Sequence, residues 1–270
     1  MKRLILILIL AVSPLSSLAD NTRLIDTVRL GLAVLDFEYE EFDDRGPSLD
    51  WEDGLLPGLD AGAAIVREQW RFDASLLWLS GVVDYGSPAE DSKTDTDILN
   101  LELTAGYGFY TTERQNLSLI AGAGYRKWWR NIRSTPTANG LDEIYDWGYG
   151  LLGLRGKHRL DQQTHLTGEF YLTRVVNPGL NVRFISHFDN AELDLGEETG
   201  FRIRLTLDRQ LSRSTSFWVS PWYEYWELGR SNDAPLFSNG IQVGTLFEPQ
   251  SETRNFGVNL GLSWRFGAEH

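Results

Sequence analysis

The sequence predicts an all-β fold: a transmembrane antiparallel up-and-down β-barrel of about ten strands. In the stretch Phe256–Phe266, large apolar residues alternate with small or polar ones, so one strand face can meet lipid and the other a polar lumen. Ten segments with this period of two can be marked along the chain. The connections between them alternate between short and long, as the periplasmic turns and extracellular loops of an outer-membrane meander do.

The first five segments differ in how clearly they alternate. The second is weak, because it is rich in glycine and alanine, so eight or twelve strands remain alternatives. The bounds and supporting apolar residues are, in chain order: Leu24–Glu40 with Val28, Leu30, Leu32 and Val34; Leu59–Glu68; Trp70–Tyr85 with Phe72, Ala74, Leu76 and Trp78; Asp97–Tyr110 with Leu99, Leu101, Leu103, Ala105, Tyr107 and Phe109; and Leu117–Arg130 with Leu119, Ala121, Ala123 and Tyr125.

The last five segments continue the pattern up to the end of the chain. A further strand over Asn181–His187 is the alternative that would raise the count. The bounds and residues are: Ile144–Lys157 with Tyr145, Trp147, Tyr149 and Leu151 on one face; His165–Val176 with Leu166, Phe170 and Leu172; Phe201–Asp208 with Ile203, Leu205 and Leu207; Thr215–Glu227 with Phe217, Val219, Tyr223 and Tyr225; and Phe256–Phe266 with Val258, Leu260, Leu262 and Trp264.

Loop length separates the two ends of the predicted barrel. Short connections are expected near Arg67–Trp70, Thr111–Gln115, His158–Gln163 and Arg209–Ser214. Long ones are expected near Glu41–Asp53, Gly86–Thr96, Asn131–Glu143, Val176–Glu198 and Arg230–Gln250. The long loops hold 18 acidic residues against five basic ones, a net charge of −13. This charge could bind divalent cations or attract cationic peptides. We interpret it as a solvated acidic surface among anionic lipopolysaccharide, without a metal site.

The N-terminus matches a secretory signal peptide, residues 1–19. Lys2 and Arg3 precede the apolar run Leu4–Val12, and Ser17-Leu18-Ala19 fits a cleavage site. Removing the two basic residues changes the net charge from −13 to about −15. We therefore predict an exported protein whose single domain, residues 20–270, lies in the outer membrane of a Gram-negative-type bacterium. Cysteine is absent, so disulfides cannot stabilise it.

The alternate faces of the segments carry charges of both signs into the predicted lumen. A barrel of about ten strands is little wider than the eight-stranded kind that its own side chains fill. We therefore predict a salt-bridged plug, with Trp218 and Trp222 inside it; an ion path is the alternative. The predicted lumen charge network comprises Arg29, Arg71, Asp73, Glu102, Arg126, Glu169, Arg202, Arg204, Glu224 and Arg265, with Arg130 and Asp208 on the same faces.

Three strings resemble the omptins, a family of ten-stranded outer-membrane proteases that depend on aspartate and histidine. They are Ser48–Trp51, Leu119–Tyr125 and Asn255–Phe266. The resemblance implies a pair of aspartates on one rim and an Asp-x-His on the other, with a water held between them.

The chain departs from that arrangement at both places. Asp84 matches one aspartate of the pair, but Gly86 stands where the second belongs. His187 and Asp189 occur in the reverse of the family's order. If the catalysis extended to this chain, its catalytic residues would be Asp84, His187 and Asp189. We predict that they do not form such a site, because a partner is missing and the loop offers no rigid position.

The sequence therefore leaves three function classes open. The first is a non-enzymatic barrel with a structural or surface-interaction role. The second is an omptin-like protease or another rim enzyme, and the third is a narrow channel. No cofactor is implied, since neither a phosphate-binding loop nor a zinc-protease motif occurs. Expected partners are outer-membrane lipid, lipopolysaccharide and, through the C-terminal strand, the barrel-assembly machinery. The acidic balance disfavours nucleic acid, and we expect a monomer.

Overall fold

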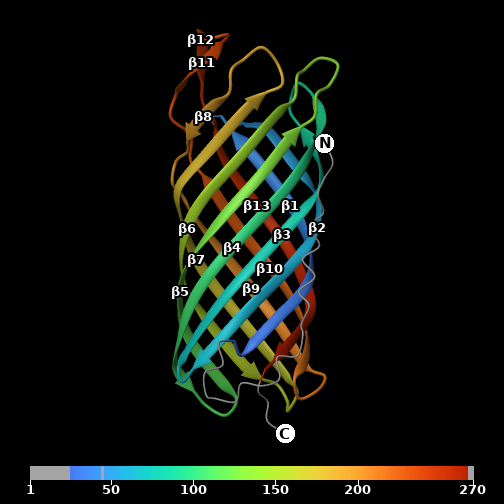
Figure 1. Ribbon diagram of the computed structural model, residues 1–270, viewed down its shortest axis with the longest axis vertical. Helices are drawn as coiled ribbons and strands as arrows, with labels where there is room; N and C mark the ends of the chain where they lie inside the picture. The colour runs from blue at the N-terminus through green and yellow to red at the C-terminus, as the bar shows by residue number, and fades with distance from the viewer. Residues whose placement is uncertain (1–24, 44–45, 267–270) are drawn as a thin grey trace, which may run out of the picture.

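The computed structural model describes residues 25–43 and 46–266, which form a closed barrel (Figure 1). Ten antiparallel strands make the ring, in the order β1-β2-β3-β4-β5-β6-β7-β9-β10-β13. β13 closes it against β1 in a continuous register from Thr27↔Arg265 to Phe42↔Gln250. The predicted ten-stranded up-and-down barrel is confirmed, and the alternatives of eight or twelve strands are wrong. The predicted signal peptide, residues 1–19, lies outside the described residues.

The ring strands are long, and three shorter strands lie above them. We call the end of the barrel near Thr27 and Arg265 the lower rim, and the end near β11 and β12 the upper rim. The strands are β1 Thr27–Phe42, β2 Ser48–Arg67, β3 Trp70–Gly86, β4 Asp91–Thr111, β5 Gln115–Ile132, β6 Leu141–Arg159, β7 Thr164–Phe184, β8 Ala191–Asp194, β9 Thr199–Gln210, β10 Thr215–Leu228, β11 Ala234–Ser238, β12 Ile241–Leu246 and β13 Gln250–Arg265.

Among these described residues, no helix is long and apolar enough to cross a membrane.

Several strands extend further toward the upper rim than the alternation predicted. β2 begins at Ser48 and pairs with β1 as far as Phe42, so the long loop expected at Glu41–Asp53 is mostly strand. The residues suggested as an extra strand near Asn181 instead continue β7 to Phe184. The prediction failed there because the outward side chains become polar, while backbone pairing needs no lipid and continues.

The outer face divides into an apolar band below and a charged wall above. On β1 the exposed residues Leu30, Leu32 and Val34 give way to exposed Asp36 and Glu38. The same transition occurs around the ring, so the band has the lipid-facing character of a membrane barrel. Further exposed residues of the band are Phe72, Leu76, Trp78, Leu101, Leu103, Leu119, Leu152, Leu154, Phe170, Leu172, Ile203, Leu205, Phe217, Phe256 and Leu260.

The inner face reverses its character at the same height. On β1 the inward positions beside the band are Gly31 and Ala33, and those above it are Leu35, Phe37 and Tyr39, all buried. Just above the band, β1 thus has the arrangement of a water-soluble barrel, charged outside and apolar inside. The lower part has the arrangement of a membrane barrel.

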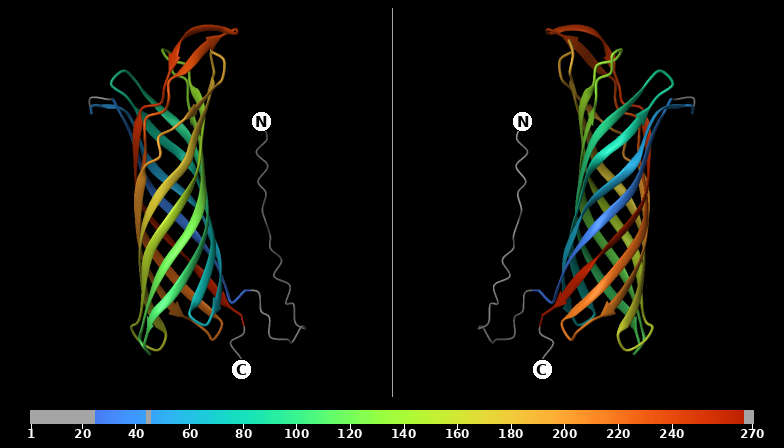
Figure 2. Two further views of the ribbon diagram at one scale, coloured as in Figure 1. Left: turned by 90° about the vertical axis from the view of Figure 1, so that its left-hand side faces the viewer. Right: turned by 90° about the vertical axis from the view of Figure 1, so that its right-hand side faces the viewer.

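A hairpin of β11 and β12 projects beyond the upper rim (Figure 2). Its turn is Asn239-Gly240, with φ of 53° and 76°. Both residues therefore adopt the left-handed conformation that a two-residue type I′ hairpin turn requires. β8 lies below the hairpin and pairs with the upper part of β7.

Candidate functional site

Three groups of ion pairs cross the lumen at different heights. Some of their ion pairs join strands that are not neighbours in the ring, such as β5 with β10 and β4 with β9. The lower layer consists of Arg71, Asp73, Arg155, Glu169 and Arg204; the middle layer of Glu102, Arg126, Arg202 and Glu224; and the upper cluster of Glu41, Asp50, Glu52, Arg130, Glu143 and Glu248.

In the lower layer, two acids lie between three arginines. Asp73 accepts hydrogen bonds from Arg71 at 2.6 Å and from Arg155 at 3.1 Å. Arg155 also donates to Glu169 at 2.5 Å, and Arg204 lies 3.9 Å from the same carboxylate. Each carboxylate thus faces two guanidinium groups, and the contact between Arg155 of β6 and Asp73 of β3 crosses the lumen.

The middle layer is almost completely removed from solvent. Glu224 accepts hydrogen bonds from Arg126 at 2.5 Å and from Arg202 at 2.9 Å, and Arg202 donates to Glu102 at 2.9 Å. The Tyr149 hydroxyl also lies 3.0 Å from Glu102. Their exposed fractions range from 1% to 8%. Buried charges persist only when opposite charges and hydrogen bonds offset their desolvation, as they do here.

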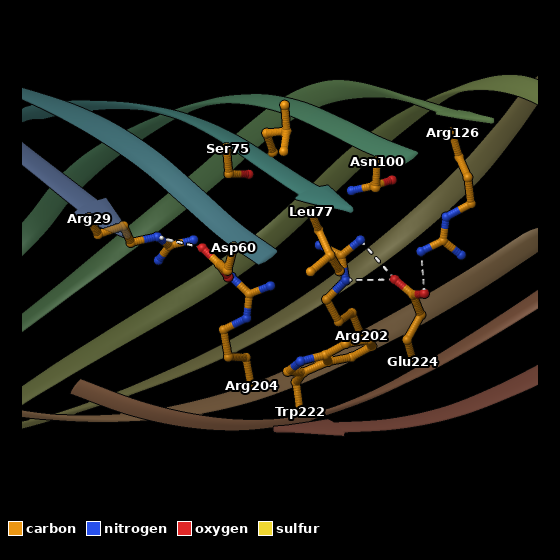
Figure 3. Close-up of a pocket in the computed structure, with 11 residues that line it drawn as sticks. Arg29, Asp60, Ser75, Leu77, Asn100, Arg126, Arg202, Arg204, Trp222 and Glu224 are labelled. Atoms are coloured by element: carbon orange, nitrogen blue, oxygen red, sulfur yellow. Dashed lines mark hydrogen bonds and ion pairs between the residues drawn. The ribbon is translucent and has the colours of Figure 1, made fainter. Parts of the chain in front are cut away.

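A side branch joins β1, β2, β10 and β13 beside the middle layer (Figure 3). Asp60 lies 3.3 Å from Arg29 and accepts a hydrogen bond from Asn259, which in turn accepts one from the Trp222 indole. The Arg29 guanidinium also lies over the Trp218 ring. A cavity of about 20 Å³ remains between this branch and the middle layer. Because one water needs about 10–15 Å³ of such space, it cannot admit a larger solute.

Aromatic rings fill the lumen above the middle layer. The Trp226 ring contacts Trp147 and Tyr149 at centroid distances of 6.0 and 5.0 Å, and the Arg126 guanidinium lies 4.9 Å from it. Phe37 packs edge-on against Trp128. Trp218 and Trp222 are both buried lower down. The charged lumen thus contains an apolar section that the sequence did not predict.

The upper cluster surrounds one arginine with acids, above the apolar band. Arg130 donates hydrogen bonds to Glu52 at 2.9 Å, Glu41 at 3.0 Å and Glu143 at 2.9 Å, and lies 3.9 Å from Asp50. Its side chain is 1% exposed. A single guanidinium thus faces four carboxyl groups.

A fifth carboxyl group enters this cluster from above. Glu248, between β12 and β13, is buried and accepts a hydrogen bond from the Tyr145 hydroxyl. Burial, together with nearby Glu41 and Glu143, raises the pKa of the Glu248 carboxyl well above its usual range. The group therefore binds a proton more tightly here than it would in water.

The residues of the omptin comparison do not meet in the structure. Asp84 lies on the outer face of β3, 66% exposed, with its carboxylate 2.5 Å from Lys93. Asp189 accepts a hydrogen bond from the Gly240 N–H, and the His187 carbonyl accepts one from Ser238. These two contacts brace the hairpin. Within the described chain, no hydrogen bond or ion pair joins Asp84 to either residue.

The remaining predicted network residues lie inside the barrel, except Arg265. That residue is exposed at the lower rim and has no ion pair among the described residues. The sequence analysis did not predict Arg155 or Glu52 as members of the network. Arg155 lies an even number of residues from the inward-facing Tyr145–Leu151 of β6, and Glu52 an even number from the inward-facing Asp60 of β2, so the alternation could have found both. Glu248 gave no signal, because it lies in a loop.

The described residues hold no group of three or more histidine, aspartate or glutamate side chains that could hold a metal ion. In the upper cluster, the centre of the acidic groups is taken by Arg130.

Comparison with known proteins identifies the fold. No family model and no curated protein matches the chain. The outer membrane protease OmpT from Escherichia coli is similar in structure, with a TM-score of 0.63 and 11% identity over 90% of this chain and 97% of OmpT. The outer membrane protein OprG from Pseudomonas aeruginosa gives a TM-score of 0.47 and 12% identity over 89% of this chain and 94% of OprG. At such identity, the likeness to OmpT shows the barrel fold alone and leaves the activity of this chain open.

Proposed function

We propose that this protein is an integral outer-membrane barrel that is closed to solutes and has a structural or surface-interaction role. The observation that carries the proposal is the packing of the lumen. The lower layer, middle layer, aromatic section and upper cluster follow one another along the barrel axis, and the cavity beside the middle layer holds little more than one water. A transport path would have to break several buried ion pairs at once.

The test is conductance in planar bilayers. The purified protein is expected to give no stable steps, whereas large reproducible steps would overturn the proposal and favour a channel. A matched control removes two opposite charges together, Glu102→Ala with Arg202→Ala, and leaves Glu224 paired with Arg126. This variant is expected to leak, which would show that the assay detects an opened lumen.

Location and partners form part of the same proposal. We infer an outer-membrane protein that contacts lipid and lipopolysaccharide, is assembled through its C-terminal strand, and acts as a monomer. The apolar band supports membrane insertion. The pairing of β13 with both β1 and β10 leaves no open edge in the ring, which supports a monomer. Heat-modifiable gel migration of protein from outer-membrane fractions tests the location, and a monomer soluble without detergent would contradict it.

A surface-interaction role is supported by the hairpin. Ile241 and Val243 of β12 are 69% and 54% exposed above the rim, and apolar exposure of this kind marks contact surfaces. An omptin-like protease is disfavoured, because Asp84 faces outward and His187 braces the hairpin.

A further inference from the structure

A segment at the upper rim contacts the barrel wall through a carboxyl group, in addition to the hairpin contacts of His187 and Asp189. The segment, which we call the lid, is Gly229–Pro249 and includes β11 and β12. At its base, the Ser231 N–H donates to the Glu248 carbonyl at 2.9 Å, and the Glu248 N–H donates to the Ser231 hydroxyl at 2.8 Å. These bonds direct the Glu248 side chain into the mouth of the barrel, where it meets Tyr145 on β6.

The lid also adds apolar residues to the buried interior of the barrel. Ala234 of β11 is buried in the same cluster as Val182 of β7 and Leu193 of β8, and Leu246 of β12 packs against it. Below the lid, the antiparallel bridge between Gly196 and Gly229 brings two backbones together without side chains, just past the end of β10. This side-chain-free bridge is the point about which the lid would turn once the contact between Glu248 and Tyr145 is lost.

The charge beneath the lid is strongly unbalanced. If every acid were ionised, the upper cluster would hold five negative charges and one positive, an excess of four in a buried space. Such an excess is costly, so the closed state favours bound protons. The titratable and charged groups that face this space are Tyr39 and Glu41 of β1, Asp50 and Glu52 of β2, Tyr85 of β3, Arg130 of β5, Glu143 and Tyr145 of β6, and Glu248 itself.

We propose that the lid is a proton-controlled cover, which stays closed while the upper cluster holds its protons and opens as they are lost. The direction follows from linkage. The closed lid raises the pKa of the Glu248 carboxyl and so favours its protonated form, whereas an open lid returns the carboxyl group to water, where it ionises above about pH 4.3. The lid is therefore fully closed below about pH 4.3. Closure weakens as the pH rises from there toward the raised pKa that the Glu248 carboxyl has in the closed state. For each proton that is released on opening, the ratio of open to closed lid rises up to tenfold per pH unit.

This inference goes beyond the proposed function. An opened lid would uncover Val182 and the upper cluster, while the middle layer below would still close the lumen. Lid opening is therefore measured by access to the mouth, whereas the proposed function is measured by conductance. The lid proposal can therefore be refuted while the closed lumen is confirmed, and the closed lumen can be refuted while the lid proposal is confirmed.

The test uses the absence of cysteine from the chain. Val182→Cys places a single thiol at a buried position near the upper end of β7, where the side chain is 4% exposed, and Val243→Cys places one on the hairpin, where it is 54% exposed. Maleimide labelling of the full-length protein in detergent is followed from pH 5.5 to 8.5. The rate at 182 is divided by the rate at 243, which removes the titration of the thiol itself. The ratio is expected to rise at least tenfold.

Glu248→Gln is the matched variant, because the amide keeps the acceptor for Tyr145 and cannot ionise. In the Val182→Cys background, the ratio is expected to change less than twofold over the same range. A flat ratio with Glu248 present, or an equal rise in the Gln variant, would overturn the proposal. Hydrogen exchange needs no substitution: after correction for intrinsic rates, protection of the amides of residues 246–248 should fall as the pH rises, and constant protection would also refute the proposal.

Discussion

Replacing Arg202 with methionine tests how far the middle layer stabilises the barrel. Arg202 is 3% exposed and donates hydrogen bonds to both Glu102 and Glu224. Without it, Glu224 keeps Arg126, but Glu102 loses the guanidinium that it pairs with. Leaving a buried charge without its partner costs about 3–5 kcal/mol, so Arg202→Met should lower the free energy of unfolding by that amount.

The assay is urea unfolding in lipid vesicles at pH 7, followed by tryptophan fluorescence and by heat-modifiable gel migration. Arg183→Met is the matched control, since Arg183 pairs with Asp142 at the surface with 67% of its side chain exposed. Its loss should cost less than about 1 kcal/mol. Adding Glu102→Gln to Arg202→Met removes the unpaired charge and should recover part of the loss. If Arg202→Met cost no more than Arg183→Met, the reasoning would be refuted.

Three further outcomes are expected. Gly257→Ala should destabilise the barrel by about 1–3 kcal/mol, because its new methyl group would lie 2.2 Å from the Trp222 ring, whereas Gly150→Ala has open space and should change the urea midpoint little. Leu103→Arg, at a site 66% exposed in the apolar band, should cost about 2–4 kcal/mol in lipid, and Asp53→Arg on the charged wall far less; equal costs would place the membrane elsewhere. A fluorogenic dibasic peptide should remain uncleaved with lipopolysaccharide present, and cleavage above that of protein-free vesicles would restore the protease hypothesis.

Period-two alternation was enough to predict the ring, because every second side chain of a membrane-spanning strand faces lipid and is therefore apolar. Leu30, Leu32 and Val34 could be assigned to the outer face, and Arg202 and Glu224 to the inner one, from spacing alone. The strand ends could not be predicted. Above the apolar band the outward positions become polar, as at Asn181 and Arg183 of β7, so the segment expected to end at Val176 continues to Phe184.

The pairing inside the lumen also could not be predicted. Whether Glu102 meets Arg126 or Arg202 depends on the stagger of strands around the ring, which sequence spacing does not encode. The hairpin did carry a local signal, since Asn239-Gly240 precedes the alternating Ile241 and Val243. Its position over the mouth, and the entry of Glu248, follow from contacts between distant parts of the chain.

The simultaneous reversal of the inner and outer faces fixes how deep the barrel sits in its bilayer. A strand advances about 3.3 Å per residue, so a shift of two residues in the direction of the lower rim would carry the row of Asp36 into hydrocarbon. An opposite shift would lift Leu30 and its neighbours into water. Both displacements are opposed around the whole circumference. The upper part is therefore held at a constant height above the apolar band, so the mouth of the barrel and the hairpin stay outside the lipid.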